Sequence, residues 1–127
     1  MAGKLTISTL NDSSGVLATQ NGMTGICKCW IVFNMSTSVI AGSFNVASIT
    51  KNGTGDFTIT FSTAMPNANY ATIGSALKNN ADYDGKFTQY STTAATTGSI
   101  RVAADNASTG GIDYTDALVV SVAVFSS

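Results

Sequence analysis

Two pairs of aspartates are the residues whose type and spacing could support chemistry. Asp82 and Asp84 stand in the sequence DYDG, and Asp113 and Asp116 stand in DYTD. Two carboxylates that flank a glycosidic bond can hydrolyse it, and a D-x-D turn can offer oxygen ligands to calcium. Both pairs lie near glycine in predicted turns, where aspartate is expected for backbone reasons alone. We therefore favour structural turns over a glycosidase or a calcium site.

The residue types that most enzymes and metal sites need are scarce. The chain has no histidine, the side chain that most often serves as acid or base near neutral pH, so a serine triad with a histidine base is excluded. Cys27 and Cys29 share one face of a predicted strand. Their Cα atoms should be roughly 6.5 to 7 Å apart, which is too distant for a disulfide. Two thiols alone do not make a structural zinc site. We expect buried thiols, no metal, no cofactor and no enzyme.

The composition predicts an all-β domain with a polar but weakly charged surface. The 127 residues suit one domain that can bury a substantial core. Threonine and serine contribute 18 and 15 residues, whereas charged residues make up only 10%. Hydroxyl-bearing residues favour strands, turns and caps over helix interiors. Hydroxyls and amides should therefore cover the solvent-exposed faces.

Two classes of partner are excluded, one by the distribution of charge and the other by the length of the apolar runs. The basic residues are scattered along the chain: Lys4, Lys28, Lys51, Lys78, Lys86 and Arg101. Binding to nucleic acid requires clustered basic side chains, and the apolar run 117–125 is too short for a membrane span of about 20 residues. The N-terminal sequence does not resemble a secretory signal. We expect no nucleic-acid partner, no membrane insertion, and assembly in a cytoplasm.

The middle of the chain carries the strongest strand signals. Residues 27–33 place Cys27, Cys29, Ile31 and Phe33 on one face, with Lys28, Trp30 and Val32 on the other. The next predicted strand covers 39–49, with Gly42 available for a bulge. Glycines at 53 and 55 predict a hairpin turn before a strand whose Phe57, Ile59 and Phe61 point inward. This region should form the core of the sheet structure.

The second half adds shorter strands. We predict them over 70–77, 87–91, 99–104 and 117–125, with Pro66 ending the strand before the first of these. The last strand is apolar on both faces, so it should lie centrally, with a second sheet or another subunit over its outer side. Seven to eight short antiparallel strands result. The fold class is therefore all-β, a β-sandwich or jelly-roll-like domain over 25–127.

Residues 1–24 are predicted to be an extended N-terminal arm. The arm carries large aliphatic anchors that should pack on the domain's own surface or on a neighbouring subunit: Leu5, Ile7, Leu10, Val16, Leu17 and Met23. Among the aromatic residues, Tyr83 and Tyr114 lie in predicted loops beside the aspartate pairs, so they are candidates for stacking on a sugar. Trp30 lies within a strand, which favours the core or a subunit interface.

Two segments resemble a known family. LTISTLNDSSGVLATQNGMTGICKCW and GSFNVASITKNGTGDFTITFSTAMPNANY resemble a domain of bacteriophage virion proteins, especially tail-fibre and adhesin-like proteins. The resemblance covers residues 5–70, and Cys29 replaces the small residue usual between the lysine and the tryptophan. It implies a virion surface protein, commonly a homotrimer, with no enzyme activity and no catalytic residue.

We therefore expect a structural protein of a bacteriophage virion, assembled in the host cytoplasm. The favoured hypothesis is a tail-fibre or receptor-binding component, in which residues 1–70 hold the particle or the trimer. Loops 78–86 and 105–116 would then contact a host glycan through Asp82, Tyr83, Asp84, Asp113 and Tyr114. The alternative is a capsid decoration or fibre-anchoring protein, in which the arm clamps neighbouring subunits and the loops bind nothing.

Overall fold

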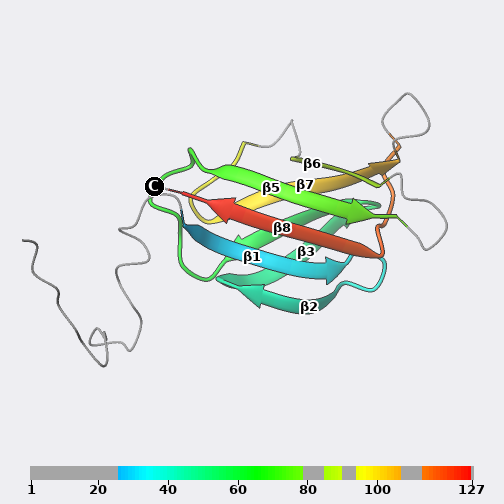
Figure 1. Cartoon of the computed structure of the whole chain (residues 1–127), viewed down its shortest axis with the longest axis horizontal. Coiled ribbons are helices and arrows are strands. Elements are labelled where there is room, and N and C mark those ends of the chain that lie inside the picture. Colours follow the sequence, from blue (N-terminus) through cyan, green and yellow to red (C-terminus); the bar gives the residue numbers. More distant parts are fainter. Residues whose placement is uncertain (1–25, 79–84, 90–93, 107–112, 127) are drawn as a thin grey trace, which may run out of the picture.

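The computed structural model describes residues 26–78, 85–89, 94–106 and 113–126, and within them it is all-β (Figure 1). Eight strands follow one another along the chain: β1 (Cys27–Asn34), β2 (Val39–Phe44), β3 (Val46–Gly53), β4 (Asp56–Phe61), β5 (Ala71–Leu77), β6 (Gly85–Gln89), β7 (Ser99–Asn106) and β8 (Val119–Phe125). The predicted arm and the residues Leu5, Ile7, Leu10, Val16 and Leu17 lie outside the described part.

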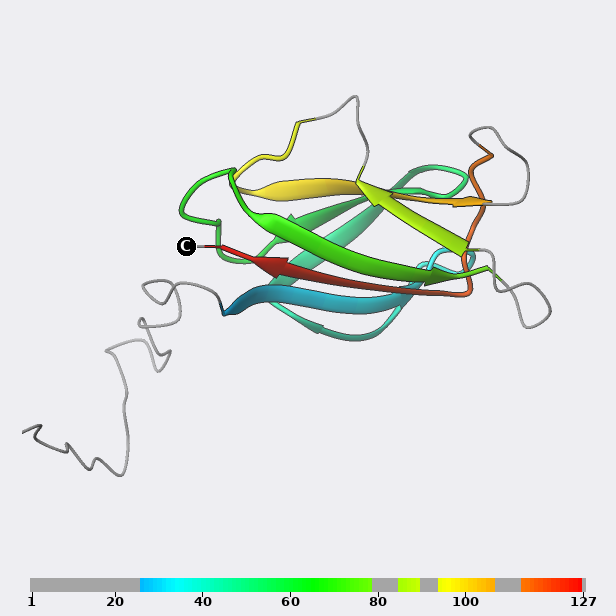
Figure 2. The ribbon, with the colours of Figure 1, turned by 45° about the horizontal axis from the view of Figure 1, so that its top comes forward.

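The strands form two antiparallel sheets that pack as a sandwich. Sheet 1 has the order β2-β1-β8-β5 and faces the viewer in Figure 1, and sheet 2 has the order β3-β4-β7-β6 behind it. Figure 2 shows the two layers from a raised angle. β8 lies between β1 and β5, which confirms its predicted central position. The predicted fold class is thus confirmed as a sandwich of eight short strands.

The core lies between the central strand pairs of the two sheets. Phe57, Ile59 and Phe61 of β4 are buried against the opposite sheet, which confirms their predicted inward phase. The rings of Phe33 and Phe57 meet edge to face across the sandwich, with centroids 5.3 Å apart. Alternating apolar residues of β1, β4, β7 and β8 supply most of the core, so period-two patterning explains its position.

A sharp corner at Asn45 divides one predicted strand into two. The prediction of a single strand over 39–49 was wrong, because β2 belongs to sheet 1 and β3 to sheet 2. Asn45 has a φ of 57°, a conformation that asparagine tolerates better than most residues. Its side chain donates to the carbonyls of Lys28 and Thr63 at 2.9 and 3.0 Å and accepts from the Thr63 amide at 2.7 Å. These bonds hold the chain where it crosses between sheets.

A bulge at the start of β1 changes the predicted facing of Lys28. The register shifts between Cys27 and Cys29, so one extra residue stands on β1. Lys28 is only 3% exposed, although the alternating pattern placed it with Trp30 and Val32 on the outer face. Beyond the bulge the predicted alternation holds, since Cys29 and Trp30 lie on opposite faces, the first buried and the second exposed. Both cysteines are free, as expected.

Candidate binding surfaces

The two predicted recognition loops begin at the same end of the sandwich. The first joins β5 to β6 and the second follows β7, and Gly85 at the start of β6 pairs with Asn106 at the end of β7. Leu77, which ends β5, accepts a hydrogen bond from the amide of Leu118 at 2.8 Å. The described ends of the two loops therefore converge. Asp82, Tyr83 and Asp84 lie outside the described residues.

A buried carboxylate secures the base of the second loop. Asp105 is 6% exposed, and its Oδ1 accepts the amide of Asp113 at 2.6 Å. The amide of Asn106 donates to the Asp113 carbonyl at 2.9 Å, and Asp105 forms an isolated bridge with Tyr114. Asp113 and Tyr114 are both exposed. Sequence reasoning found these two residues but missed Asp105, because burial of a single aspartate leaves no local signal.

Asp116 has a structural role instead of pairing with Asp113. Its Oδ2 lies 2.6 Å from Nζ of Lys51, and its Oδ1 accepts the amide of Gly55 at 2.8 Å. Gly55 has a φ of 62°, and a Cβ there would lie 2.6 Å from the Ala104 carbonyl oxygen. Only glycine fits this turn between β3 and β4. The carboxylate of Asp116 therefore fastens the segment before β8 to β3 and to the turn that follows it.

The chain enters the sandwich at the end opposite to the loops. Cys27 at the start of β1 and Ala71 at the start of β5 both pair with Phe125, at one end of β8. Leu77 pairs with Val119, at the other end of β8. In Figure 1 the C-terminal end of the described chain lies on the left, and the end of β5 lies on the right. The two ends of the sandwich therefore differ: the chain enters at one end and the loops begin at the other.

The outer face of sheet 1 is apolar. Register places Phe44, Trp30, Ala123 and Ile73 in one row across its four strands, and opposed residues in such a ladder share a face. Trp30 is 42% exposed and Ile73 is 65% exposed. The indole of Trp30 lies over β2, where a Cβ on Gly42 would be 3.3 Å from it. Trp30 therefore belongs to this face and not to the core.

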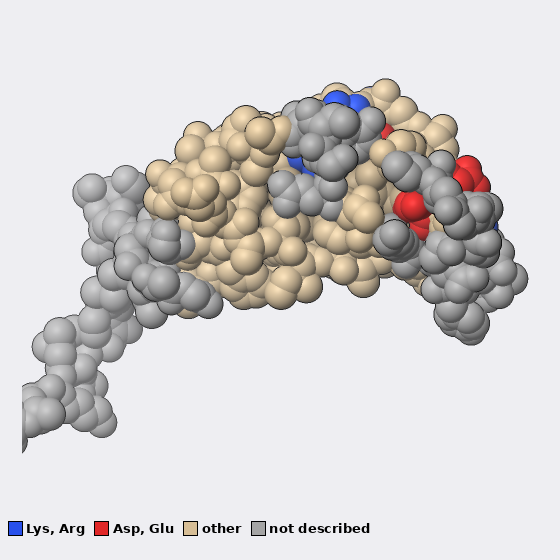
Figure 3. Space-filling model, turned by 90° about the horizontal axis from the view of Figure 1, so that it is seen from above, with Lys and Arg blue, Asp and Glu red and all other residues tan. Residues whose placement is uncertain are grey.

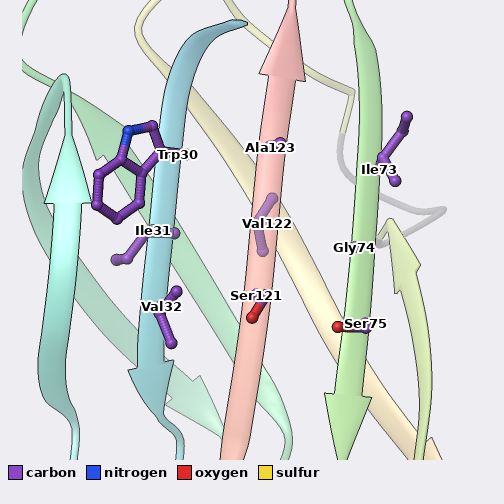
Figure 4. A pocket seen from close by; sticks show the side chains of 9 residues that line it. All are labelled: Trp30, Ile31, Val32, Ile73, Gly74, Ser75, Ser121, Val122 and Ala123. Carbon is purple, nitrogen blue, oxygen red and sulfur yellow. The ribbon is translucent and has the colours of Figure 1, made fainter.

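A trough of about 330 Å³ runs across this face between β1 and β5. In Figure 4 Trp30 of β1 stands on one side of it and Ile73 of β5 on the other, with Ala123 of β8 level with them. The short side chains of Ser121 and Ser75 lie one row further along β8 and β5. Ala123 contributes only a methyl group to the floor. The largest apolar side chain in the middle of β5, Ile73, thus points outward, toward this trough.

The outer face of sheet 2 differs in both polarity and charge. Thr58 and Arg101 are opposite each other on it, and the guanidinium of Arg101 holds the Asp56 carboxylate through two nitrogens. These hydrogen bonds from Arg101 keep the pKa of Asp56 below its ordinary value despite desolvation. The strands of sheet 2 carry five charged residues: Lys51, Asp56, Lys86, Arg101 and Asp105. Figure 3 views the molecule from above, not onto this face, and shows blue and red atoms at few places among the tan ones.

The strands of sheet 1 carry a single charged residue, Lys28. Its ammonium nitrogen is buried without a hydrogen-bond partner. The outer surface that sheet 1 offers to a partner is therefore free of charge.

The described residues offer little reactive chemistry. Burial raises the pKa of the Cys29 thiol to about 12, with a smaller contribution from Cys27, so Cys29 stays protonated and is a poor nucleophile at neutral pH. Within the described ranges no group of three or more carboxylates or thiols could hold a metal ion. The same ranges contain no helix long and apolar enough to cross a membrane.

Comparison of the chain with models of protein families, with curated proteins and with solved structures found no match.

Proposed function

We propose that this chain is a structural protein of a bacteriophage virion, a tail-fibre or receptor-binding component that contacts a host-surface glycan. The observation that carries the proposal is that the chain enters at one end of the sandwich and both loops begin at the other. The chain enters opposite Phe125, and both loops begin near Val119 and Asn106 at the other end. β8 separates these ends by about 20 Å. A protein held by its N-terminal side would present its loops outward.

The loop end has the chemistry that a glycan contact requires. Tyr114 is 37% exposed, and an exposed tyrosine offers a ring for stacking and a hydroxyl for hydrogen bonding. Asp113 beside it can accept hydrogen bonds from sugar hydroxyls. Asp82, Tyr83 and Asp84 belong to the adjacent loop and repeat the same residue types. Loops on a rigid scaffold commonly carry recognition, and no catalytic step is part of this proposal.

The apolar outer face of sheet 1 favours a second candidate, a capsid decoration or fibre-anchoring protein. A contiguous exposed apolar patch on a small protein often marks a contact with another protein. Trp30, Phe44 and Ile73 form such a patch. In this alternative the face holds the protein on other virion proteins, and the loops bind nothing.

Locating the protein on particles separates the two candidates. Antibodies raised against the full chain would be gold-labelled and applied to purified particles of the virus that encodes it. We expect label at the tail-fibre tips. Label over the capsid would replace the receptor proposal by decoration, and particles without any label would remove both.

Adsorption competition tests the loop assignment. The purified full chain should slow adsorption of the phage to host cells by occupying the receptor. Tyr83→Ala and Tyr114→Ala should each weaken this competition by about 10-fold, as loss of an aromatic anchor typically does. Thr50→Ala on the exposed outer face of sheet 2 is the matched control and should compete like the wild type. Undiminished competition by both tyrosine variants would refute the assignment.

A further inference from the structure

We propose that the outer face of sheet 1 docks a second copy of this chain and buries Trp30 between the two copies. This inference rests on the proposed function, to which it adds a contact between subunits of the virion protein. It concerns different residues from the loop end, so it can be tested without particles or host cells.

The distribution of exposed apolar side chains selects this face. Apart from Tyr114, the large hydrophobic residues that the described chain exposes all lie on strands of sheet 1: Trp30, Val39, Ile40, Phe44, Ile73 and Val119. The strands of sheet 2 expose none of comparable size. Burying apolar surface contributes a favourable free energy of about 25 cal/mol for each Å². Sheet 1 therefore gains most from being covered.

The lack of charge favours another copy as the partner. The only charged residue on the strands of sheet 1 is Lys28, and its amino group is buried. A charge-free face attracts no charged partner, and two such faces meet without like-charge repulsion or unpaired ions. Sheet 2 could not cover it equally well, because its outer face carries the Arg101 and Asp56 pair. An identical face is the best electrostatic match that this molecule offers.

The shape of the face suits contact with itself. A two-fold interface uses the same patch twice, so a projecting group and a hollow must both lie within that patch. Ile73 projects with 65% of its surface exposed, and the trough beside it is floored by Ser121 and Ala123 (Figure 4). Ile73 of one copy can enter the trough of the other. The indole of Trp30 then lines the contact from both sides.

The area of the face indicates weak association. Four strands at about 4.8 Å spacing and roughly six residues in length present about 400 Å² for each copy. Two copies would bury about 800 Å² plus surface relief, which is less than the roughly 1,200 Å² of a standard specific interface and fits a weak, transient contact. β2 pairs with β1 alone among the described strands, and this edge carries no charge or proline that would block a neighbour. We expect association that dilution reverses.

Trp30 is the single tryptophan, so it reports directly on its own burial. Sedimentation velocity and acrylamide quenching of fluorescence would be measured on the full chain from roughly 100 μM to roughly 0.1 μM, a span set for interfaces of this size. The expected result is a dimer or larger oligomer at the high end. Quenching should increase on dilution in step with dissociation, and the emission should move to longer wavelength.

Ile73→Lys is the decisive variant, because it places a charge in the contact at a position that is exposed in the single chain. We expect its dissociation constant to rise by at least about 10-fold, as for truncation of an interface anchor. Ser48→Lys adds the same charge on the exposed outer face of sheet 2 and should associate like the wild type. Ile73→Thr keeps the β-branch and should weaken association less, and a thermal melt of each variant verifies folding.

Two results would overturn the inference. If the chain is a monomer at every concentration, the face docks no second copy, and a Trp30 that is then shielded from acrylamide is covered by another segment of the same chain. If Trp30 remains open to acrylamide within an oligomer, the copies meet elsewhere. Either result leaves the localisation on particles unaffected, and a failed localisation leaves the self-contact unaffected, so the two proposals fail separately.

Discussion

The carboxylate of Asp116 lies 2.6 Å from the ammonium group of Lys51, a residue 65 positions earlier in the sequence. Its second oxygen accepts the amide of Gly55 in the turn between β3 and β4. One aspartate thus connects the turn of sheet 2 to the segment that leads into β8. The sequence pairs Asp116 with Asp113, but the structure uses the two residues for different tasks.

Replacing Asp116 should separate its two roles. Asp116→Ala removes the acceptor of the Gly55 amide, and the free energy of unfolding should fall by about 1–3 kcal/mol. Asp116→Asn keeps an acceptor oxygen and loses only the partly exposed ion pair with Lys51, which is worth about 0.5 kcal/mol. Urea denaturation at neutral pH measures both changes. Equal losses in the two variants would show that the turn does not depend on this acceptor.

The close approach of β5 to β6 predicts a severe effect of Gly74→Ala. A Cβ at Gly74 would lie 2.5 Å from the ring of Phe87, so the ring must move, and overpacking of this kind costs about 1–3 kcal/mol. Gly98→Ala is the matched control, since no atom lies within 4 Å of its added Cβ. Urea denaturation of both variants tests the difference.

The same contact can be tested by coupling. Phe87→Ala should cost less stability in the Gly74→Ala background than in the wild type, because the clash is then relieved. A double-mutant cycle should give a coupling of at least about 1 kcal/mol. Strictly additive losses would contradict the contact between Gly74 and Phe87.

The ion pair of Asp56 and Arg101 predicts a loss of stability in acid. Hydrogen bonds from Arg101 lower the pKa of Asp56 in the folded chain. The resulting stabilisation is complete above the unfolded pKa of about 3.9 and disappears as pH falls through the lower folded pKa. Arg101→Met should be less stable at neutral pH, with a smaller further loss between about pH 4 and pH 2. Urea midpoints across this range provide the measurement, and parallel pH profiles would contradict the role of Arg101.

Two buried groups predict a loss of stability in alkali. Burial raises the pKa of Cys29 from 9.0 to about 12 and that of Tyr70 from 10.0 to about 12. The unfolded chain therefore releases these protons first, so stability is complete below pH 9.0 and declines toward pH 12. Cys29→Ala should flatten this decline, although the lost volume lowers stability at neutral pH. Thermal melts between pH 8 and pH 11 measure how steeply stability declines with pH. If another group caused the decline, Cys29→Ala would show the same slope as the wild type.

Local patterning was sufficient for the strands and for most of the core. Strict alternation located the inward face of β4, from Phe57 to Phe61, because a strand repeats every two residues. The apolar character of both faces of β8 correctly placed it at the centre of a sheet. The bulge that buries Lys28 and the corner at Asn45 escaped prediction, because both depend on partners distant in sequence.

The candidate surfaces were predictable only in part. Loop composition identified Asp113 and Tyr114, which the structure places in an exposed stem. The convergence of this stem with the start of β6 depends on the pairing of Gly85 with Asn106, and no local pattern encodes strand order. Trp30 was assigned to the core or to an interface, and only the register shows that it shares a row with Ile73, across β8, on an outer face.

The corner at Asn45 provides a last test, because conformation and hydrogen bonding can be separated there. Asn45 adopts a φ of 57°, and its side chain makes three hydrogen bonds to the backbone of Lys28 and Thr63. Asn45→Gly retains access to this φ and loses only the hydrogen bonds, so we expect a cost of about 1–3 kcal/mol. Asn45→Ala loses the bonds and also imposes a side chain that disfavours positive φ. It should cost about 1 kcal/mol more than the glycine variant.

Chemical denaturation of the two variants gives both differences. Ser38 is a matched control, since it also has a positive φ, 58°, in the turn between β1 and β2. Ser38→Gly should therefore be neutral or stabilising, because it removes the backbone strain of a positive φ and breaks no hydrogen bond that joins the sheets. If Asn45→Gly behaved like Ser38→Gly, the backbone turn alone would direct the chain from one sheet to the other. A loss confined to the Asn45 variants would show that the side-chain bonds are what tie β1 and the end of β4 to this corner.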